Sequence, residues 1–357
     1  MAARLAFGAA QRRVHALVDA GLESVELRLA VLREIAGVIP IDGAFFPTSD
    51  PATLLHTSAV RIDIPDALAS RFLDNELATP DVNKFRSLAA QRSAVATLDV
   101  ATRGDRSISP RAREIMLPAG LGDELRVAFR TSAATWGFAC LHRATGGSFT
   151  DEEIHFMQAV APHVGEALRR AVVAARAASD PSPDAPGVLT VADDLTLIAA
   201  TAAGERWLDD LATAERPPSR PLPVAVMSIV RSLQYDARPT YTPSITVRAA
   251  SGRWLVLHAS HLGSADDGRV AVVIGPASRV ELEPALAAGY GLTPREAQVM
   301  THVLRGLASK TIANTMHITT NTANDHLKSI FTKTGASSRG QLMAVVFRDS
   351  HSLRSRD

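Results

Sequence analysis

The sequence predicts a multidomain α+β protein that ends in an all-α domain of four helices. At 357 residues the chain is long enough for two or three domains, and 46% hydrophobic with 21% charged residues is typical of globular proteins. A proline-rich stretch at 179–187 and a proline- and glycine-interrupted stretch at 278–291 read as linkers. We therefore expect an N-terminal helical segment at 1–38, α+β domains at 39–178 and 188–277, and an all-α domain at 292–357.

The pattern of the first domain alternates between helical and strand periodicity. Apolar residues recur at helical spacing from about 12 to 38 and predict one helix. Thr150 and Glu153 have the spacing of a capping box, which starts a long helix predicted to reach residue 178. Between these helices we predict strands at 43–46, 59–64, 123–131 and 135–142, and a helical region at 66–91. The last two strands and the segment FTDEEIHFMQAVAPHVGEALRR resemble the end of a GAF domain, which in many proteins holds a small effector.

The middle domain combines two short strands, two helices and three strands. Trp207 and Trp254 fall within this pattern, and we expect both in its core. The predicted strands are 187–194, 195–200, 244–249, 254–260 and 269–275, with helices around 203–208 and 224–233. Turns are expected at Ser251-Gly252 and Asp266-Asp267-Gly268. This order resembles a PAS fold.

Few of the first 280 residues suggest a catalytic, metal-binding or redox role. The single cysteine, Cys140, excludes an internal disulfide and any cysteine-cluster metal site, and its apolar neighbours predict a buried strand thiol. His142 and His155 do not share a metal-ligand spacing, so surface or capping roles are expected for both. We predict no cofactor and no metal. A small-molecule effector in the α+β domains stays open, and the sequence does not identify it.

The last domain carries a complete set of helix start and stop signals. The first helix of this domain begins with Thr293 as N-cap and Pro294 at the first helical position, and Glu296 completes a capping box with Thr293. Gly306 ends this helix. A second helix spans about 309–316. Thr319 caps a third, and Gly335 follows it where a left-handed residue is favoured. Ser338 with Gln341 starts a fourth helix. This spacing predicts a helix-turn-helix.

The third helix of this domain has two distinct faces. On a helical wheel, Ala323, Leu327, Ile330 and Phe331 form a narrow apolar stripe that can dock on the other helices. The opposite face gathers amides, a carboxylate and a lysine, the groups that pair with base edges in a major groove. Its members are Asn321, Asn324, Asp325, Lys328 and Thr332. Residues 292–357 carry nine Lys/Arg against four Asp/Glu, net +5, whereas the rest of the chain has net −4. This local excess suits phosphate attraction.

This stretch resembles the LuxR-type DNA-binding domain of bacterial transcription regulators over roughly the last 60 residues. The resemblance implies that Lys310 contacts phosphate, that Asn324, Asp325 and Lys328 read bases, and that Thr320 and Thr322 belong to the same DNA-binding surface. Ala323 and Asn324 depart from the family, which usually has Val and often Lys there, so its sequence preference does not carry over. The matching residues are LTPRE at 292–296, Gly306, Lys310, Ile312-Ala313, His317-Ile318-Thr319, Thr322, His326-Leu327, Ile330, Lys333, Gly335 and Ser338-Arg339.

These features predict a one-component transcription regulator whose GAF-like and PAS-like domains modulate DNA binding. We expect double-stranded DNA and a second copy of the chain as partners, RNA polymerase as a further candidate, no membrane, and a cytoplasmic location. Two alternatives stay open. The first half could be an enzyme with an appended DNA-binding domain, although no phosphate loop, nucleophile elbow or metal-ligand motif is present. It could also be a scaffold that binds no ligand.

Overall fold

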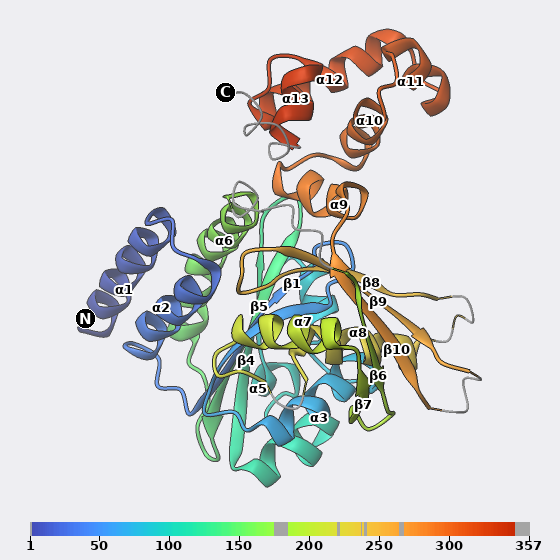
Figure 1. The fold of residues 1–357 in the computed structure, drawn as a ribbon. Coiled ribbons are helices and arrows are strands. Elements are labelled where there is room, and N and C mark those ends of the chain that lie inside the picture. Colours follow the sequence, from blue (N-terminus) through green and yellow to red (C-terminus); the bar gives the residue numbers. More distant parts are fainter. Residues whose placement is uncertain are drawn as a thin grey trace, which may run out of the picture.

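A computed structural model describes residues 2–174, 185–219, 222–236, 238, 241–263 and 268–346. Two five-stranded antiparallel sheets, each with its own helices, are followed by a group of C-terminal helices (Figure 1). This architecture confirms a mixed α and β chain that ends in an all-α domain. Among the described helices, none is long and apolar enough to cross a membrane.

The first sheet has the strand order β2-β1-β5-β4-β3. In strand β1, Phe46 faces one hydrophobic cluster and Phe45 faces two others, because successive side chains point to opposite faces of a sheet. Both faces of the sheet are therefore covered. The strands are β1 (Gly43–Ser49), β2 (His56–Ile62), β3 (Val95–Thr97), β4 (Leu121–Arg130) and β5 (Thr135–Ala144).

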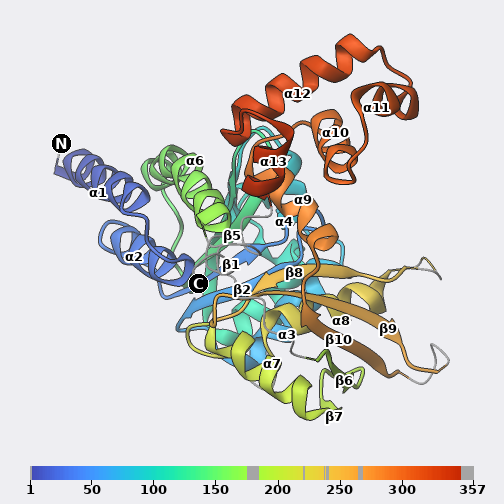
Figure 2. The same ribbon diagram turned by 45° about the horizontal axis from the view of Figure 1, so that its top comes forward.

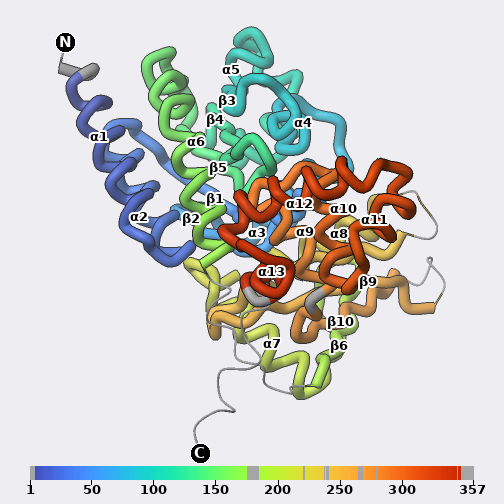
Figure 3. Tube along the Cα trace, turned by 90° about the horizontal axis from the view of Figure 1, so that it is seen from above, coloured from blue at the N-terminus to red at the C-terminus, as the bar shows by residue number. Residues whose placement is uncertain are grey.

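One face of this sheet is covered by α1 (Ala2–Asp19), α2 (Ser24–Ala36) and α6 (Asp151–Ala174), which lie side by side in Figures 1 and 3. The prediction of one N-terminal helix was wrong, because the chain turns between α1 and α2 at Gly21, where φ is +66°. Val164 and Leu168 of α6 are buried in the core they form with α1, α2 and the sheet. These two side chains are therefore not available for contact with a second copy of the chain.

Helix α6 approaches the sheet closely at one glycine. A Cβ atom at Gly165 would lie 2.8 Å from backbone atoms of Arg130 in β4, so a larger residue there would push the helix outward. The other face of the sheet is covered by shorter segments: α3 (Asp66–Leu77), α4 (Phe85–Ala90), α5 (Leu98–Ala101), η1 (Arg106–Ile108), the π-helical turn η2 (Ala112–Met116) and η3 (Leu117–Ala119).

The second sheet has the order β7-β6-β10-β9-β8 and packs against two helices. Trp207 is buried in its core, as predicted, and Trp254 is half-buried. The predicted order of strands and helices is confirmed. The elements are β6 (Gly187–Val191), β7 (Leu197–Ala200), α7 (Ala202–Thr213), α8 (Val224–Tyr235), β8 (Ser244–Arg248), β9 (Trp254–His261) and β10 (Val270–Pro276). Most of the predicted linker 179–187 and of the turn at 266–268 lies outside the described residues.

The two α+β domains share part of one hydrophobic core. Leu55, Ala59 and Leu73 of the first domain belong to the same buried cluster as the side chains of α7, α8 and the second sheet. Polar contacts cross the junction as well: Asp50 accepts hydrogen bonds from the backbone and side chain of Thr246 at 3.2 and 3.1 Å. Separating the two domains would expose this apolar surface to water, which is unfavourable.

A helix, α9 (Arg279–Gly289), occupies the segment predicted as the second linker. Ser278 and Glu281 form a capping box in which the Ser278 amide donates to the Glu281 carboxylate at 2.6 Å. Pro284 lies inside the helix, but Leu286 and Ala287 bury their side chains in the C-terminal core. Cap and burial together outweigh the hydrogen bond that proline removes. Figures 1 and 2 show α9 between the α+β domains and the remaining helices.

Candidate DNA-binding interface and a buried ion-pair network

Four helices follow α9 and share one hydrophobic core: α10 (Pro294–Leu304), α11 (Ser309–Met316), α12 (Thr320–Thr334) and α13 (Arg339–Val346). Their ends lie where the sequence predicted them. Thr293 and Glu296 form the capping box of α10, with the Glu296 amide 3.3 Å from Thr293 Oγ1. Thr319 caps α12 by accepting from the Thr322 amide at 3.1 Å, and Gly335 ends it with φ of +70°. Local side-chain chemistry therefore fixes the helix-turn-helix.

The apolar stripe of α12 docks on the other helices as predicted. Ala323, Leu327 and Ile330 are buried, and Phe331 is partly buried against the same core. The buried carboxylate of Glu296 in α10 holds the far end of α12, where it accepts from Ser329 Oγ at 2.5 Å and from Lys333 Nζ at 2.6 Å. Burial alone would raise the pKa of Glu296, but the hydrogen bonds from Lys333, Ser329 and Thr293 lower it to about 2.

The opposite face of α12 is exposed along its length. Lys328 Nζ lies 3.8 Å from Asp325 Oδ1, but the two side chains are 80% and 74% exposed, so the pair contributes little and leaves both groups available. Every polar residue that the helical wheel placed opposite the stripe is exposed: Asn321, Asn324, Asp325, Lys328 and Thr332. A surface of this composition can present donors and acceptors to base edges.

The other predicted contact residues lie at helix N-termini. Lys310 is exposed as the second residue of α11. Thr320 and Thr322 are exposed in the first turn of α12, and Thr322 Oγ1 lies 2.9 Å from Thr319 Oγ1. Helix N-termini attract phosphate through free backbone amides and the helix dipole. His326 is half-buried, in keeping with the predicted packing role.

One residue near this surface was not given a role from the sequence. Arg339, the first residue of α13, donates to the Leu307 carbonyl at 2.5 Å and to Ser309 Oγ at 2.8 Å. These contacts fix the start of α11, next to Lys310. The only sequence signal for Arg339 was its place in the family-like pattern, because its partners lie some 30 residues earlier in the chain.

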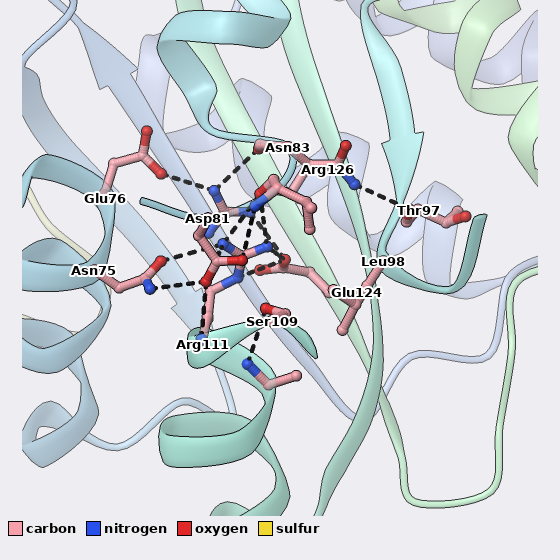
Figure 4. Close-up of polar contacts among 12 residues, drawn as sticks. Asn75, Glu76, Asp81, Asn83, Thr97, Leu98, Ser109, Arg111, Glu124 and Arg126 are labelled. Carbon is pink, nitrogen blue, oxygen red and sulfur yellow. Dashed lines mark hydrogen bonds and ion pairs between the residues drawn. The ribbon is translucent and has the colours of Figure 1, made fainter. Parts of the chain in front are cut away.

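A buried ion-pair network lies on the α3 side of the first sheet (Figure 4). Arg111 and Arg126 both contact Glu124 Oε2, at 2.8 and 2.9 Å, and all three side chains are nearly inaccessible to solvent. On the far side, Glu76 accepts a hydrogen bond from Arg126 Nη1 at 2.7 Å. Asp81 lies 3.6 Å from Arg111 Nη1 and accepts a hydrogen bond from the Arg111 backbone amide at 2.8 Å. Burial alone would raise the pKa of Glu124, but Arg111 and Arg126 lower it to about 2. Paired and hydrogen-bonded in this way, the charges tie α3 and η2 to β4.

The network also surrounds His142 and Cys140. The predicted surface or capping role of His142 was wrong: it is 1% exposed, because α3 covers this part of β5. Burial lowers the pKa of His142 to about 4. Cys140 is buried as predicted. Oxygen, sulfur and nitrogen atoms of Glu124, Cys140 and His142 lie within 4.8 Å of one another, but the two guanidinium groups beside Glu124 oppose a cation there. His155 is exposed, with Nδ1 2.7 Å from the Asp151 carbonyl.

The chain is remotely similar to several solved structures. Escherichia coli SdiA is 12% identical and covers 95% of this chain and 96% of its own, with a TM-score of 0.35. A phage VqmA–DPO complex (15% identity, 46% of this chain, 81% of its own) has a TM-score of 0.24. The Vibrio cholerae VqmA dimer is 14% identical, covers 46% of this chain and 82% of its own, and has a TM-score of 0.21. Such scores do not define the fold of the α+β domains.

The C-terminal helices have a direct sequence counterpart. No curated protein matches the chain significantly in sequence. The family model described as bacterial regulatory proteins of the luxR family matches residues 291–346, which begin just after α9 and end with α13. The matched range therefore contains the whole helix-turn-helix and its exposed α12 face. Residues 291–346 form a LuxR-family helix-turn-helix, the DNA-binding domain of a transcriptional regulator.

Proposed function

We propose that this chain is a sequence-specific regulator of transcription that binds duplex DNA as a dimer. The observation that carries the proposal is the two-faced α12, whose buried stripe fixes it to the domain while Asn324, Asp325 and Lys328 stand exposed together. In this proposal α12 lies in the major groove, and those three side chains read base edges. Lys310, Thr320 and Thr322 contact phosphates and set the position of the helix.

The α+β domains, which we assign as GAF-like and PAS-like, act as the regulatory half and carry no catalytic role. Helix α9 connects them to DNA binding, because Leu286 and Ala287 lie in the core of the helix-turn-helix domain while Ala288 packs against the core of the first domain. Arg169 of α6 also donates to the Gly289 carbonyl. A change in how the α+β domains pack therefore reaches the DNA-binding domain through one helix.

A dimer is part of the proposal because a single helix-turn-helix contacts few base pairs. Two copies placed on half-sites about 34–36 Å apart double the contacts, and the DNA site then mirrors the two-fold symmetry of the protein. Because Val164 and Leu168 are buried in the chain's own core, the dimer contact must use other surfaces.

Selection from a random duplex library tests the proposal. The full-length protein should enrich a motif of two inverted half-sites about one helical turn apart. Asn324→Ala should lose that enrichment. Arg206→Ala, which changes an exposed residue of α7, is the matched control and should select the same motif as the wild type. Failure of the wild-type chain to enrich any sequence would rule out specific recognition, and enrichment of a single half-site by a monomer would rule out the dimer.

A further inference from the structure

A cavity of about 410 Å³ lies where the two α+β domains and α9 meet. Its walls come from the start of α2, strands β1 and β2, helix α6, the β8–β9 hairpin and, through Ala285, helix α9. The volume falls within the roughly 300–1,000 Å³ of small-molecule sites, and such sites favour domain interfaces. Apolar atoms, among them those of Trp136, Leu168 and Val172, supply most of the wall surface, and polar or charged residues make up half of the lining.

Arg28 gives this cavity a buried positive charge. It lies in α2, is 1% exposed, and lines the cavity. Its guanidinium donates to the carbonyls of Ser24, Phe46 and Ser58 and to Ser58 Oγ, which accounts for four of its five N–H groups. Among the described residues no carboxylate forms an ion pair with it, although Glu215 acts at longer range. Buried charges are normally paired, because an unpaired one is expensive to desolvate.

Both carboxylates that line the cavity already have hydrogen-bond or ion-pair partners within the chain. Asp50 is saturated by hydrogen bonds, from the amides of Ala52 and Thr53 on one oxygen and from Thr246 on the other. Glu23 pairs with Arg248 Nη1 at 2.6 Å. The charged side chains that line the cavity are thus three arginines, Arg28, Arg216 and Arg248, and two carboxylates, Glu23 and Asp50. Glu215 acts on Arg28 from outside this lining. The lining itself has a net charge of +1, which favours an anion.

Trp254 adds a hydrogen-bond donor that lacks a partner. Its side chain lines the cavity, and Nε1 is buried without an acceptor in the described part of the chain. A buried donor left unpaired is unfavourable, and an acceptor on a bound molecule would remove that cost. By contrast, Trp136 Nε1 already donates to Thr131 Oγ1 and Trp207 Nε1 to the Ala185 carbonyl.

We propose that this cavity binds an amphiphilic organic anion, an apolar body of drug-like size that carries one carboxylate or similar acidic group. The apolar walls enclose the body, Arg28 supplies the counter-charge, and Trp254 Nε1 donates to an acceptor atom. Since Ala285 of α9 forms part of the wall, the bound molecule touches the helix that leads to the DNA-binding domain. The effect of the bound molecule on DNA binding rests on the proposed function, whereas its binding to the cavity does not.

Isothermal titration calorimetry of the full-length protein with 8-anilinonaphthalene-1-sulfonate, a rigid amphiphilic anion, tests this proposal. We expect saturable binding of one molecule per chain. Trp254→Phe keeps the ring but removes the donor, so it should weaken binding about 10-fold. Trp207→Phe makes the same change at a tryptophan that does not line the cavity, and its affinity should equal that of the wild type.

A second pair of variants tests the location. Ala171→Trp on α6 fills the cavity and should abolish saturable binding, whereas Ala174→Trp, on an exposed position of the same helix, should not. Circular dichroism of each variant establishes that it is folded. Absence of saturable binding by the wild type, equal losses in the two tryptophan-to-phenylalanine variants, or unchanged binding by folded Ala171→Trp would each overturn the proposal. None of these results would affect the DNA-selection experiment, which contains no dye.

Discussion

Lys333 Nζ lies 2.6 Å from Glu296 Oε2, so the last turn of α12 is tied to the first turn of α10. The same carboxylate closes the capping box of α10 and accepts from Ser329. One buried glutamate therefore joins the start of one helix to the end of another. The protonation state of Glu296 should therefore control how firmly α12 is held against α10.

We predict that α12 loosens in acid. The pKa of Glu296 is about 2 in the folded chain and about 4.3 when unfolded, so its stabilisation is complete above pH 4.3 and is lost as the pH falls toward 2. The difference corresponds to about 3 kcal/mol. Hydrogen–deuterium exchange of α12, corrected for the intrinsic rate, should show protection falling from pH 5 to pH 3.

Glu296→Gln should show weaker protection of α12 already at pH 7 and little further dependence on pH. Glu205→Gln, an exposed glutamate on α7, serves as the control and should behave like the wild type. Equal protection of α12 in Glu296→Gln and wild type at pH 7 would show that the Lys333 and Ser329 contacts do not hold the helix.

Loss of Lys310 should weaken DNA binding without changing its specificity. A phosphate contact carries no sequence information, so Lys310→Ala should lower affinity for all duplexes alike and reduce the slope of log K against log salt by about one unit. Fluorescence anisotropy titrations at several salt concentrations measure both quantities. An unchanged slope would place Lys310 away from the phosphates.

Helix α9 should be part of the folded C-terminal unit. A fragment that begins at Ser278 keeps the capping box, the buried Leu286 and the hydrogen bond from Thr301 Oγ1 to Glu283 at 2.9 Å. A fragment that begins at Gly291 loses them all. Removal of one buried leucine side chain costs about 2–5 kcal/mol, so the shorter fragment should be less stable by at least about 2 kcal/mol in urea. Equal stabilities of the two fragments would show that α9 does not contribute to the folded C-terminal unit and acts as a linker.

The ion-pair network should depend on its shared carboxylate. Glu124→Gln leaves Arg111 and Arg126 buried without their common partner, and breaking a buried pair in this way costs about 3–5 kcal/mol. The unfolding temperature of the full-length chain should fall clearly, whereas the same change at exposed Glu205 should leave it within error. A Glu124→Gln variant as stable as the wild type would mean that the network does not stabilise this face of the sheet.

The helix-turn-helix could be predicted from sequence because its determinants are local. Thr293 with Glu296, Thr319 with Thr322, and Gly335 all act within a few residues of the backbone they fix. The two-faced α12 follows from the same periodicity. The DNA-contact roles of its exposed residues stay predictions.

The features that sequence analysis missed depend on distant partners. Helix α9 contains Pro284 and Gly289, which favour a break, and only packing of Leu286 on the C-terminal core reverses that preference. His142 looked like a surface residue because the helix that covers it, α3, lies some 70 residues earlier in the chain. The cavity beside Arg28 has walls drawn from most of the chain, so no local pattern could reveal it.

The central claim is that the exposed face of α12 reads DNA sequence, and the discrimination of Asn324→Ala tests it most directly. Affinities of wild type and variant are measured for the selected site and for the same site with its half-sites scrambled, at one salt concentration. We predict that the variant loses about 1–3 kcal/mol on the selected site and little on the scrambled one, so its specificity ratio falls. A variant that keeps the full wild-type ratio would contradict the assignment of this face.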